Sequence, residues 1–234
     1  MSKPGEKCGV VAVYAPSQEP ARLAFFALYA LQHRGQESAG ICTADGQSLH
    51  NLTGMGLVSQ VFRDRDIAKL RGTLAIGHTR YSTTGSSNLQ NAQPMVVGSS
   101  LGGLALAHNG NVVNVEEVRR KVLDLGVTPR TATDSELIAH LIAQAPGDDW
   151  LSRMRHGLRQ LKGAFCLVML TPDRLYVARD PWGIRPMVLG RLDNGWVVAS
   201  ESCALDTIGA QLIREVWEHD GSHFNDIFTA LGRS

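Results

Sequence analysis

The order of the elements that the sequence predicts indicates an α+β fold with antiparallel sheets. Short Val-rich and apolar runs, typical of strands, form one group before residue 110 and another after residue 163, and helical patterns lie between the two groups. The turn signals Asp45-Gly46 and Asp193-Asn194-Gly195 each join two such runs and are typical of hairpins. A sandwich of two sheets with helices outside would place both groups of strands economically, so we expect that architecture.

The first half of the chain begins with a strand and a helix. The apolar run Gly9–Ala15 is closed by Pro16, which predicts a buried strand. Residues 20–33 are apolar almost all round, which predicts a helix covered on several sides and stopped by Gly35. The later elements expected in this half are strands at 38–45, 48–56, 73–81 and 104–110, a short helix or helical loop at 56–70 and a polar loop at 82–95.

In the second half of the chain the sequence predicts three helices followed by four strands. Asn114 is expected to cap a helix over 114–125, and Thr133 with Glu136 predicts a capping box at the start of the next. The remaining elements are helices over 133–144 and 149–161 and strands over 164–170, 174–180, 187–192 and 195–200. After Val216 the chain is polar and then carries four apolar residues at helical spacing, which predicts one short amphipathic helix. These residues are Phe224, Ile227, Phe228 and Leu231.

The composition is ordinary for a globular protein, with 44% hydrophobic and 19% charged residues. The formal net charge is +1, so no global field would attract nucleic acid or an anionic membrane surface. No apolar stretch approaches the ~20 residues of a membrane-spanning helix. The cysteines form no C-x-x-C pair; they are Cys8, Cys42, Cys166 and Cys203. Such scattered thiols fit a reducing compartment, so we expect a cytoplasmic protein with no nucleic-acid or membrane partner.

Cys8 follows a short polar leader and directly precedes an apolar run. The leader carries lysines, but Glu6 lies beside the apolar run and Pro16 ends it, which argues against a signal peptide. One interpretation is a small buried core thiol, which is common for a free cysteine. The other is a nucleophile that becomes active when residues 1–7 are removed.

A thiol nucleophile needs a base, and the sequence offers two kinds. His33, His78 and His108 each end or follow a predicted element, so any of them could approach Cys8. Removal of residues 1–7 would instead create an α-amine with a reference pKa of ~7.7–8.0 beside a thiol at ~8.5, which suits a general base. Cys8 would then supply both nucleophile and base.

Three further motifs could complete a site around this thiol. Arg80, in "HTRYSTTG", could bind a carboxylate with two N–H groups, or lie in a surface turn. Asn109 and Gly110, in "HNGN", offer donors for an oxyanion hole, or form a plain turn. Asp134, in the first turn of a helix, could bind an ammonium group, or complement the helix dipole. Together these groups fit an α-amino acid with a side-chain amide, which is glutamine.

The chain also resembles a known family. The segments "CGVVAVYA", "LQHRGQESAG", "GHTRYSTTG", "LALAHNGN", "TDSELIAHLI", "LKGAFCLVML", "RDPWGIRPM" and "ASESCALD" occur in the order found in class II glutamine amidotransferase domains. Within that class the chain is most similar to the glutaminase half of the amidophosphoribosyltransferase family, over residues 8–216. The resemblance implies an N-terminal-nucleophile fold, a four-layer αββα sandwich of two mainly antiparallel sheets.

The resemblance assigns a role to each candidate. It implies that Cys8 is the nucleophile and that residues 1–7 are a propeptide. Asn109 and Gly110 resemble the oxyanion hole, Arg80 the ligand of the glutamine α-carboxylate, and Asp134 that of its α-amine. The remaining residues that we place around the substrate are Arg34 and Gly35 in the "HRGQ" turn, Thr83 and His78.

The reaction implied by the resemblance is hydrolysis of glutamine to glutamate and ammonia, with no cofactor and no metal. The ammonia would pass to phosphoribosyl pyrophosphate in a phosphoribosyltransferase domain or chain, where Mg²⁺ would act, giving phosphoribosylamine for purine synthesis. No motif of that domain occurs here, so residues 217–234 are expected to form an atypical tail. His219 and His223 in the tail have no third metal ligand nearby.

Other assignments remain open at this point. Tyr81 rather than Trp after Arg80 argues against the glucosamine-6-phosphate synthase type. Cys8 does not directly follow Met1, which argues against that type and against the asparagine synthetase type. The domain could also bind glutamine or a synthase partner without turnover, and the sequence leaves a homo-oligomer open.

Overall fold

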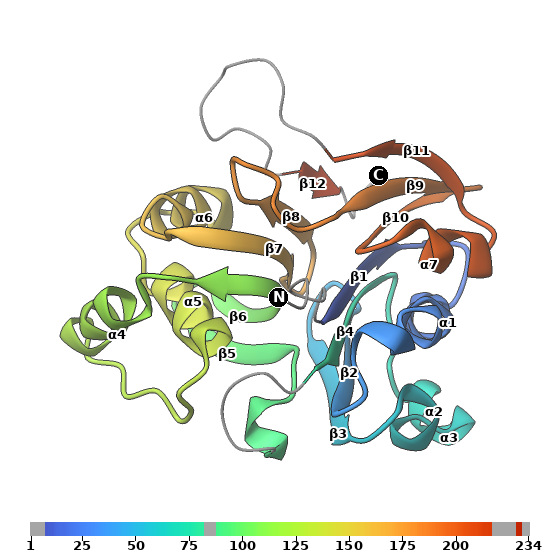
Figure 1. Cartoon of the computed structure of the whole chain (residues 1–234), viewed down its shortest axis with the longest axis horizontal. Helices are drawn as coiled ribbons and strands as arrows, with labels where there is room; N and C mark the ends of the chain where they lie inside the picture. Colours follow the sequence, from blue (N-terminus) through green and yellow to red (C-terminus); the bar gives the residue numbers. More distant parts are fainter. Residues whose placement is uncertain (1–7, 82–87, 217–227, 231–234) are drawn as a thin grey trace, which may run out of the picture.

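A computed structural model describes residues 8–81, 88–216 and 228–230. Two antiparallel sheets face each other, and helices cover the outer side of each, so the chain forms four layers in the order α, β, β, α (Figure 1). The α+β prediction and the expected two-sheet sandwich are therefore confirmed. No helix in the described ranges is both long enough and apolar enough to cross a membrane.

The first sheet has seven strands within the described residues, in the order β11-β9-β10-β1-β4-β2-β3. Their bounds are β1 (Gly9–Tyr14), β2 (Ser38–Ala44), β3 (Leu49–Met55), β4 (Leu74–Arg80), β9 (Val188–Leu192), β10 (Gly195–Ala199) and β11 (Gln211–Glu215). The second sheet has the order β12-β8-β7-β6-β5. Its bounds are β5 (Met95–Ser99), β6 (Gly102–Val112), β7 (Gly163–Leu170), β8 (Leu175–Arg179) and β12 (Phe228–Ala230).

The helices divide between the two outer layers (Figure 1). The first sheet is covered by α1 (Pro20–Ala30), α2 (Val58–Val61), α3 (Asp64–Ile67) and α7 (Ser202–Thr207). The second sheet is covered by α4 (Val115–Asp124), α5 (Asp134–Ala143) and α6 (Trp150–Leu158). Two short 3₁₀ helices, η1 (Gln32–Arg34) and η2 (Leu89–Asn91), lie in connections.

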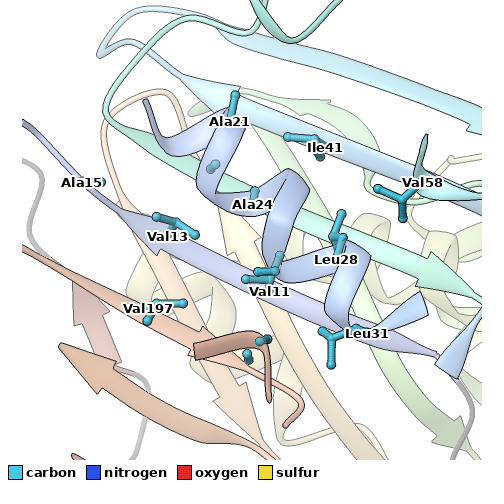
Figure 2. Packing of buried hydrophobic residues seen from close by; sticks show 14 of the residues in the cluster. Val11, Val13, Ala15, Ala21, Ala24, Leu28, Leu31, Ile41, Val58 and Val197 are labelled. Atoms are coloured by element: carbon cyan, nitrogen blue, oxygen red, sulfur yellow. The ribbon is translucent and has the colours of Figure 1, made fainter. Parts of the chain in front are cut away.

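Strand β1 is buried on both faces, which explains its continuous apolar run. Its alternate residues Val11 and Val13 point to α1, where Ala24 and Leu28 pack against them (Figure 2). Val10 and the other residues of opposite parity point into the layer between the sheets. The nucleophile candidate thus directly precedes a strand held rigidly from both sides.

Helix α1 is covered as predicted but ends differently. It packs on the first sheet and against α7 and α2, which confirms the expected coverage on several sides, and its exposed residues are Phe26 and Tyr29, at 42% and 56%. The helix ends at Ala30, and η1 carries the chain on to Gly35, whose backbone is extended. Gly35 is therefore no left-handed cap, and its need for glycine has another cause, described below.

Two side-chain caps and three elements also depart from prediction. Thr133 accepts a hydrogen bond from the Glu136 amide, but the Glu136 carboxylate accepts from Arg130 and Thr131 instead of completing the box. Asn114 bonds to the 160–162 loop and does not cap its helix with its side chain. Strands β5 and β11 and helix α7 were not predicted. In the tail, 228–230 pair with β8 as a strand, so the predicted helix is wrong there; the rest of the tail lies outside the described residues.

Candidate active site

Strand register brings Cys8 to the same edge of the first sheet as Arg80. Gly9 pairs with Thr79, and Ser38 pairs with Arg80, so the start of β1, the end of β4 and the start of β2 meet there. Cys8 lies one residue before Gly9, with a φ of +74°, a left-handed conformation that is uncommon for a residue other than glycine. In this conformation one other residue is hydrogen-bonded to both the backbone N–H and the backbone carbonyl of Cys8.

That residue is Arg34, which is almost fully buried at 2% exposure. The Cys8 N–H donates to the Arg34 carbonyl at 3.0 Å, and Arg34 Nε donates to the Cys8 carbonyl at 2.8 Å. Arg34 Nη1 also pairs with the carboxylate of Glu201. The "HRGQ" turn therefore does pack against the nucleophile candidate, as the resemblance implied.

Gly35 lets this turn lie directly on β4. A Cβ atom at Gly35 would lie only 2.6 Å from the carbonyl carbon of Arg80 and 2.7 Å from that of Thr79. The position requires glycine because of space, since its backbone angles are open to any residue. The absence of a side chain at Gly35 thus brings Arg34 and Arg80 onto the same end of the sheet.

Arg80 is buried and forms an ion pair that the sequence analysis missed. Its Nη1 donates to Glu37 Oε1 at 2.5 Å, and the Glu37 N–H donates to the Arg80 carbonyl at 3.0 Å. Both side chains are less than a tenth exposed. Glu37 lies within "HRGQES", where a charged residue next to a glycine turn is more typical of a surface loop. The pair orients the Arg80 guanidinium at the edge of the first sheet where Cys8 lies.

Asn109 and Gly110 lie inside β6 and do not form a turn after it. Asn109 is fully buried, and neither its side-chain nitrogen nor its oxygen has a hydrogen-bond partner among the described residues. Buried amides are almost always paired, because leaving one unpaired costs ~1–3 kcal/mol. An unpaired buried donor of this kind is suited to a developing oxyanion.

Gly110 is a glycine because β7 leaves no room for a side chain. A Cβ atom there would lie 2.1 Å from the carbonyl oxygen of Ala164 and 2.6 Å from Nε2 of His108. Because Gly110 has no side chain, β7 can lie close to β6 next to Asn109. This arrangement is compatible with a backbone donor beside a side-chain donor.

Asp134 is the first residue of α5 and is held as a carboxylate. Its Oδ2 accepts from the Val112 N–H at 3.3 Å, and its Oδ1 lies 3.5 Å from His108 Nδ1. Burial raises the pKa of this carboxyl, but His108 and the backbone amides of Val112 and Ser135 outweigh it and lower the pKa to about 2. Asp134 is therefore ionised at neutral pH and can hold an ammonium group.

Gln93 fixes the neighbours of Asp134, and the sequence analysis did not identify it. Its Oε1 accepts from the His108 N–H at 2.7 Å, and its Nε2 donates to Ser135 Oγ at 2.9 Å. Gln93 falls in a polar loop, and no local signal distinguishes it from its neighbours. It connects this loop to β6 and α5, the two elements that carry Asn109 and Asp134.

His78 lies between the two sheets. Its Nε2 donates to the carbonyl of His108 at 3.1 Å, and burial lowers its pKa to about 3, so the ring is neutral. This contact ties β4 to β6. Of the three candidate histidine bases, His33 pairs with Glu201 and His108 lies at Asp134. None of the three has a described hydrogen bond to Cys8.

Two of the predicted groups, Arg80 and Asp134, act electrostatically on the Cys8 thiol. Burial raises the pKa of this thiol, while the Tyr81 backbone amide and the Arg80 guanidinium lower it, with Asp134 acting in the raising direction. The thiol therefore lies close to the predicted carboxylate ligand and the predicted ammonium ligand. Thr83 and residues 1–7 lie outside the described residues.

Comparisons with known proteins identify the family of this chain. A family model described as "Glutamine amidotransferase domain" matches residues 78–207. The chain is 53% identical over 220 residues to an amidophosphoribosyltransferase of Synechococcus elongatus and 46% identical over 224 residues to one of Mycobacterium tuberculosis, covering 92% of this chain in each case and 45% and 42% of those proteins. It therefore spans somewhat less than half the length of these curated relatives.

A solved structure shares the fold. The glutamine phosphoribosylpyrophosphate amidotransferase of B. subtilis, in complex with ADP and GMP, superimposes with a TM-score of 0.84 at 38% identity over 90% of this chain and 45% of that one. This similarity confirms the N-terminal-nucleophile fold expected from the motifs. Because the family model covers more than half of the chain, the chain belongs to the glutamine amidotransferase domain family.

Proposed function

We propose that this chain hydrolyses the side-chain amide of glutamine to glutamate and ammonia, with Cys8 as the nucleophile. One observation carries the proposal: the charges of Arg80 and Asp134 act on the Cys8 thiol, while the buried side-chain amide of Asn109 in β6 has no hydrogen-bond partner among the described residues. The catalytic unit would span residues 8–216, with residues 1–7 as a removable leader and 217–234 as a tail.

Two opposite charges would select an α-amino acid. The Arg80 guanidinium, oriented by Glu37, binds the α-carboxylate, and the ionised Asp134 binds the α-ammonium group. Holding both groups fixes the direction of the side chain and so delivers the carboxamide to the thiol. Thr83 and the backbone around Arg34 and Gly35 complete the substrate contacts in this proposal.

The chemistry follows from an exposed N-terminal cysteine. The α-amine takes the thiol proton, and the Cys8 sulfur attacks the carboxamide carbon. Asn109 Nδ2 and the Gly110 N–H stabilise the oxyanion, and the α-ammonium returns its proton to the departing nitrogen. Ammonia leaves and a glutamyl thioester remains. Water, deprotonated by the amine, then attacks the thioester and releases glutamate and the free thiol. No cofactor enters these steps.

We propose that the ammonia serves a phosphoribosyltransferase. The relatives named amidophosphoribosyltransferase are more than twice as long as the matched region. A phosphoribosyltransferase domain or chain would use the ammonia on phosphoribosyl pyrophosphate to form phosphoribosylamine, with Mg²⁺ acting only there. For this chain by itself we expect the glutaminase reaction alone.

The test compares the purified chain with Cys8→Ala and Cys8→Ser. Glutamate and ammonia should form in equal amounts with the wild type, and neither variant should produce them. Retained turnover in the variants would place the nucleophile elsewhere. Calorimetry with glutamine, run beside the assay, identifies binding without turnover, which would make the domain a glutamine-binding module.

A further inference from the structure

Strand register brings Glu201 to the sheet edge where Cys8 lies, on the side of β1 that pairs with β10. Val11 pairs with Ala199 of β10, and the ladder continues as the Val10 N–H donates to Ser200 Oγ and the Ser200 N–H to the Val10 carbonyl. Glu201 follows at once, as the N-terminal flank of α7. It is therefore level with the residues that immediately precede β1, although it lies far from them in sequence.

The Glu201 carboxylate joins two side chains of η1. Its Oε1 accepts from Arg34 Nη1, and its Oε2 lies 3.0 Å from His33 Nε2. Arg34 is 2% exposed while the Glu201 side chain is 34% exposed, so the pair has its cation inside and its anion toward solvent. Burying a guanidinium without a paired carboxylate costs free energy. The ion pair with Glu201 therefore helps to keep Arg34 in its buried position.

We propose that Glu201 is a positioning residue for Cys8, holding Arg34 in the orientation that fixes the Cys8 backbone and neutralising the Arg34 charge beside the thiol. This inference rests on the proposed role of Cys8 as nucleophile. Glu201 touches no substrate in the proposed mechanism. Its effect reaches Cys8 through the two Arg34 hydrogen bonds, from Nε to the Cys8 carbonyl and from the Cys8 N–H to the Arg34 carbonyl.

The charges around Cys8 show what the loss of Glu201 would change. Among the described residues, Arg34, Arg80 and Asp134 are the charged groups that act on the thiol. Glu201 balances Arg34, as Glu37 balances Arg80. Without Glu201 the Arg34 charge beside the thiol loses this balancing carboxylate, which favours the thiolate. The groups proposed to bind the glutamine carboxylate and ammonium stay in place.

Two substitutions separate charge from reach. Glu201→Gln keeps the shape and an acceptor oxygen but loses the charge, whereas Glu201→Asp keeps the charge but shortens the side chain. We expect both to lower kcat by about tenfold or more, because small displacements of a reacting group are costly, with KM for glutamine little changed. Glu116→Gln is the matched control: this exposed carboxylate on α4 forms an ion pair with Arg119, at 3.9 Å, and its substitution should leave both constants unchanged.

The decisive readout is the rate at which iodoacetamide alkylates Cys8 across about pH 6 to 10, around the ordinary thiol pKa of ~8.5. Peptide mass spectrometry resolves Cys8 from Cys203, whose sulfur lies 3.7 Å from Glu201 Oε2. Glu201→Gln should move the Cys8 midpoint to lower pH, and Glu201→Asp and Glu116→Gln should keep the wild-type midpoint. Thermal unfolding of each variant confirms that it is folded.

The outcomes separate this inference from the proposed function. An unchanged midpoint and kcat in a folded Glu201→Gln variant, or a rise in KM alone, would overturn the positioning role. If Glu201→Gln does not fold, an unchanged kcat in Glu201→Asp would overturn it. Alkylation needs no glutamine turnover. A midpoint shift in a chain without glutaminase activity would therefore support the positioning role while the proposed reaction fails.

Discussion

Glu37 and Arg80 form a buried ion pair at the end of β4, with Arg80 Nη1 2.5 Å from Glu37 Oε1. The pair joins the "HRGQES" turn to "HTRY", two motifs more than forty residues apart, at the edge where Cys8 precedes β1. An arginine held in this way presents a fixed guanidinium to a ligand. The proposed capture of the glutamine carboxylate depends on it.

Arg80→Ala should therefore raise KM for glutamine steeply. Hydrogen bonds to charged groups contribute about 1.5–3 kcal/mol, so we expect KM to rise by roughly 10- to 150-fold. Arg80→Lys is the graded control, since one ammonium group keeps the charge but not the planar fork. Its KM for glutamine should lie between those of the wild type and of Arg80→Ala. Steady-state kinetics on glutamine measure both. An unchanged KM in Arg80→Ala would remove Arg80 from the substrate site.

Asn109→Leu should lose activity without losing stability. One oxyanion donor is worth about 2.7–4 kcal/mol, so kcat should fall by roughly 10²- to 10³-fold. Leucine has a similar volume and removes a buried amide that has no partner among the described residues, so the midpoint of thermal unfolding should stay the same or rise. A normal kcat in Asn109→Leu, with or without a clear loss of thermal stability, would show that the amide does not serve an oxyanion. A clear loss of thermal stability would show that it serves the fold.

Asp134 should contribute stability that disappears in acid. Its pKa is lowered to about 2 in the folded chain from the ordinary ~3.9, so the carboxylate stabilises the fold above that ordinary value. The contribution is lost as the pH falls from about 4 to about 2. Asp134→Asn should show a smaller change in unfolding free energy between about pH 5 and pH 2 than the wild type does. Equal changes in the two proteins would contradict the assigned protonation state.

Gly110→Ala should destabilise the fold strongly. The new Cβ would lie 2.1 Å from the Ala164 carbonyl oxygen, a clash with backbone that cannot be relieved by a side-chain rotation. Overpacking of this kind typically costs ~1–3 kcal/mol or more. Gly98→Ala, in β5 of the same sheet, is the control, since nothing lies within 4 Å of its Cβ position. Denaturant unfolding of the two variants should differ; equal stabilities would mean that β6 and β7 separate easily.

The sequence predicts most of the strands because their signals are local. The Asp45-Gly46 turn lies between β2 and β3 as expected, and the predicted turn at Asp193-Asn194-Gly195 joins β9 to β10, which begins at Gly195. Strand β5 escaped detection because it is a short edge strand with only alternate residues buried. In the described part of the tail the backbone pairs with β8, since tertiary pairing overrides a weak helical pattern in a short segment.

The sequence motifs named the residues whose charges act on the Cys8 thiol in the structure, Arg80 and Asp134, while the catalytic and binding roles of all three stay predictions. The residues that hold them were missed. Glu37, Gln93 and Glu201 are polar residues in loops or at element ends, and their importance lies in partners brought near by sheet register. Local sequence carries no trace of such contacts.

The most direct test of the central claim is an intact mass of the purified chain before and after reaction with an electrophilic glutamine analogue. The account predicts a mass that lacks residues 1–7 and gains one adduct, located on an N-terminal Cys8 and absent when Cys8 is replaced by alanine. Glutamine in excess should slow the labelling. An unprocessed mass with no adduct on Cys8 would contradict the claim that this thiol is the working nucleophile.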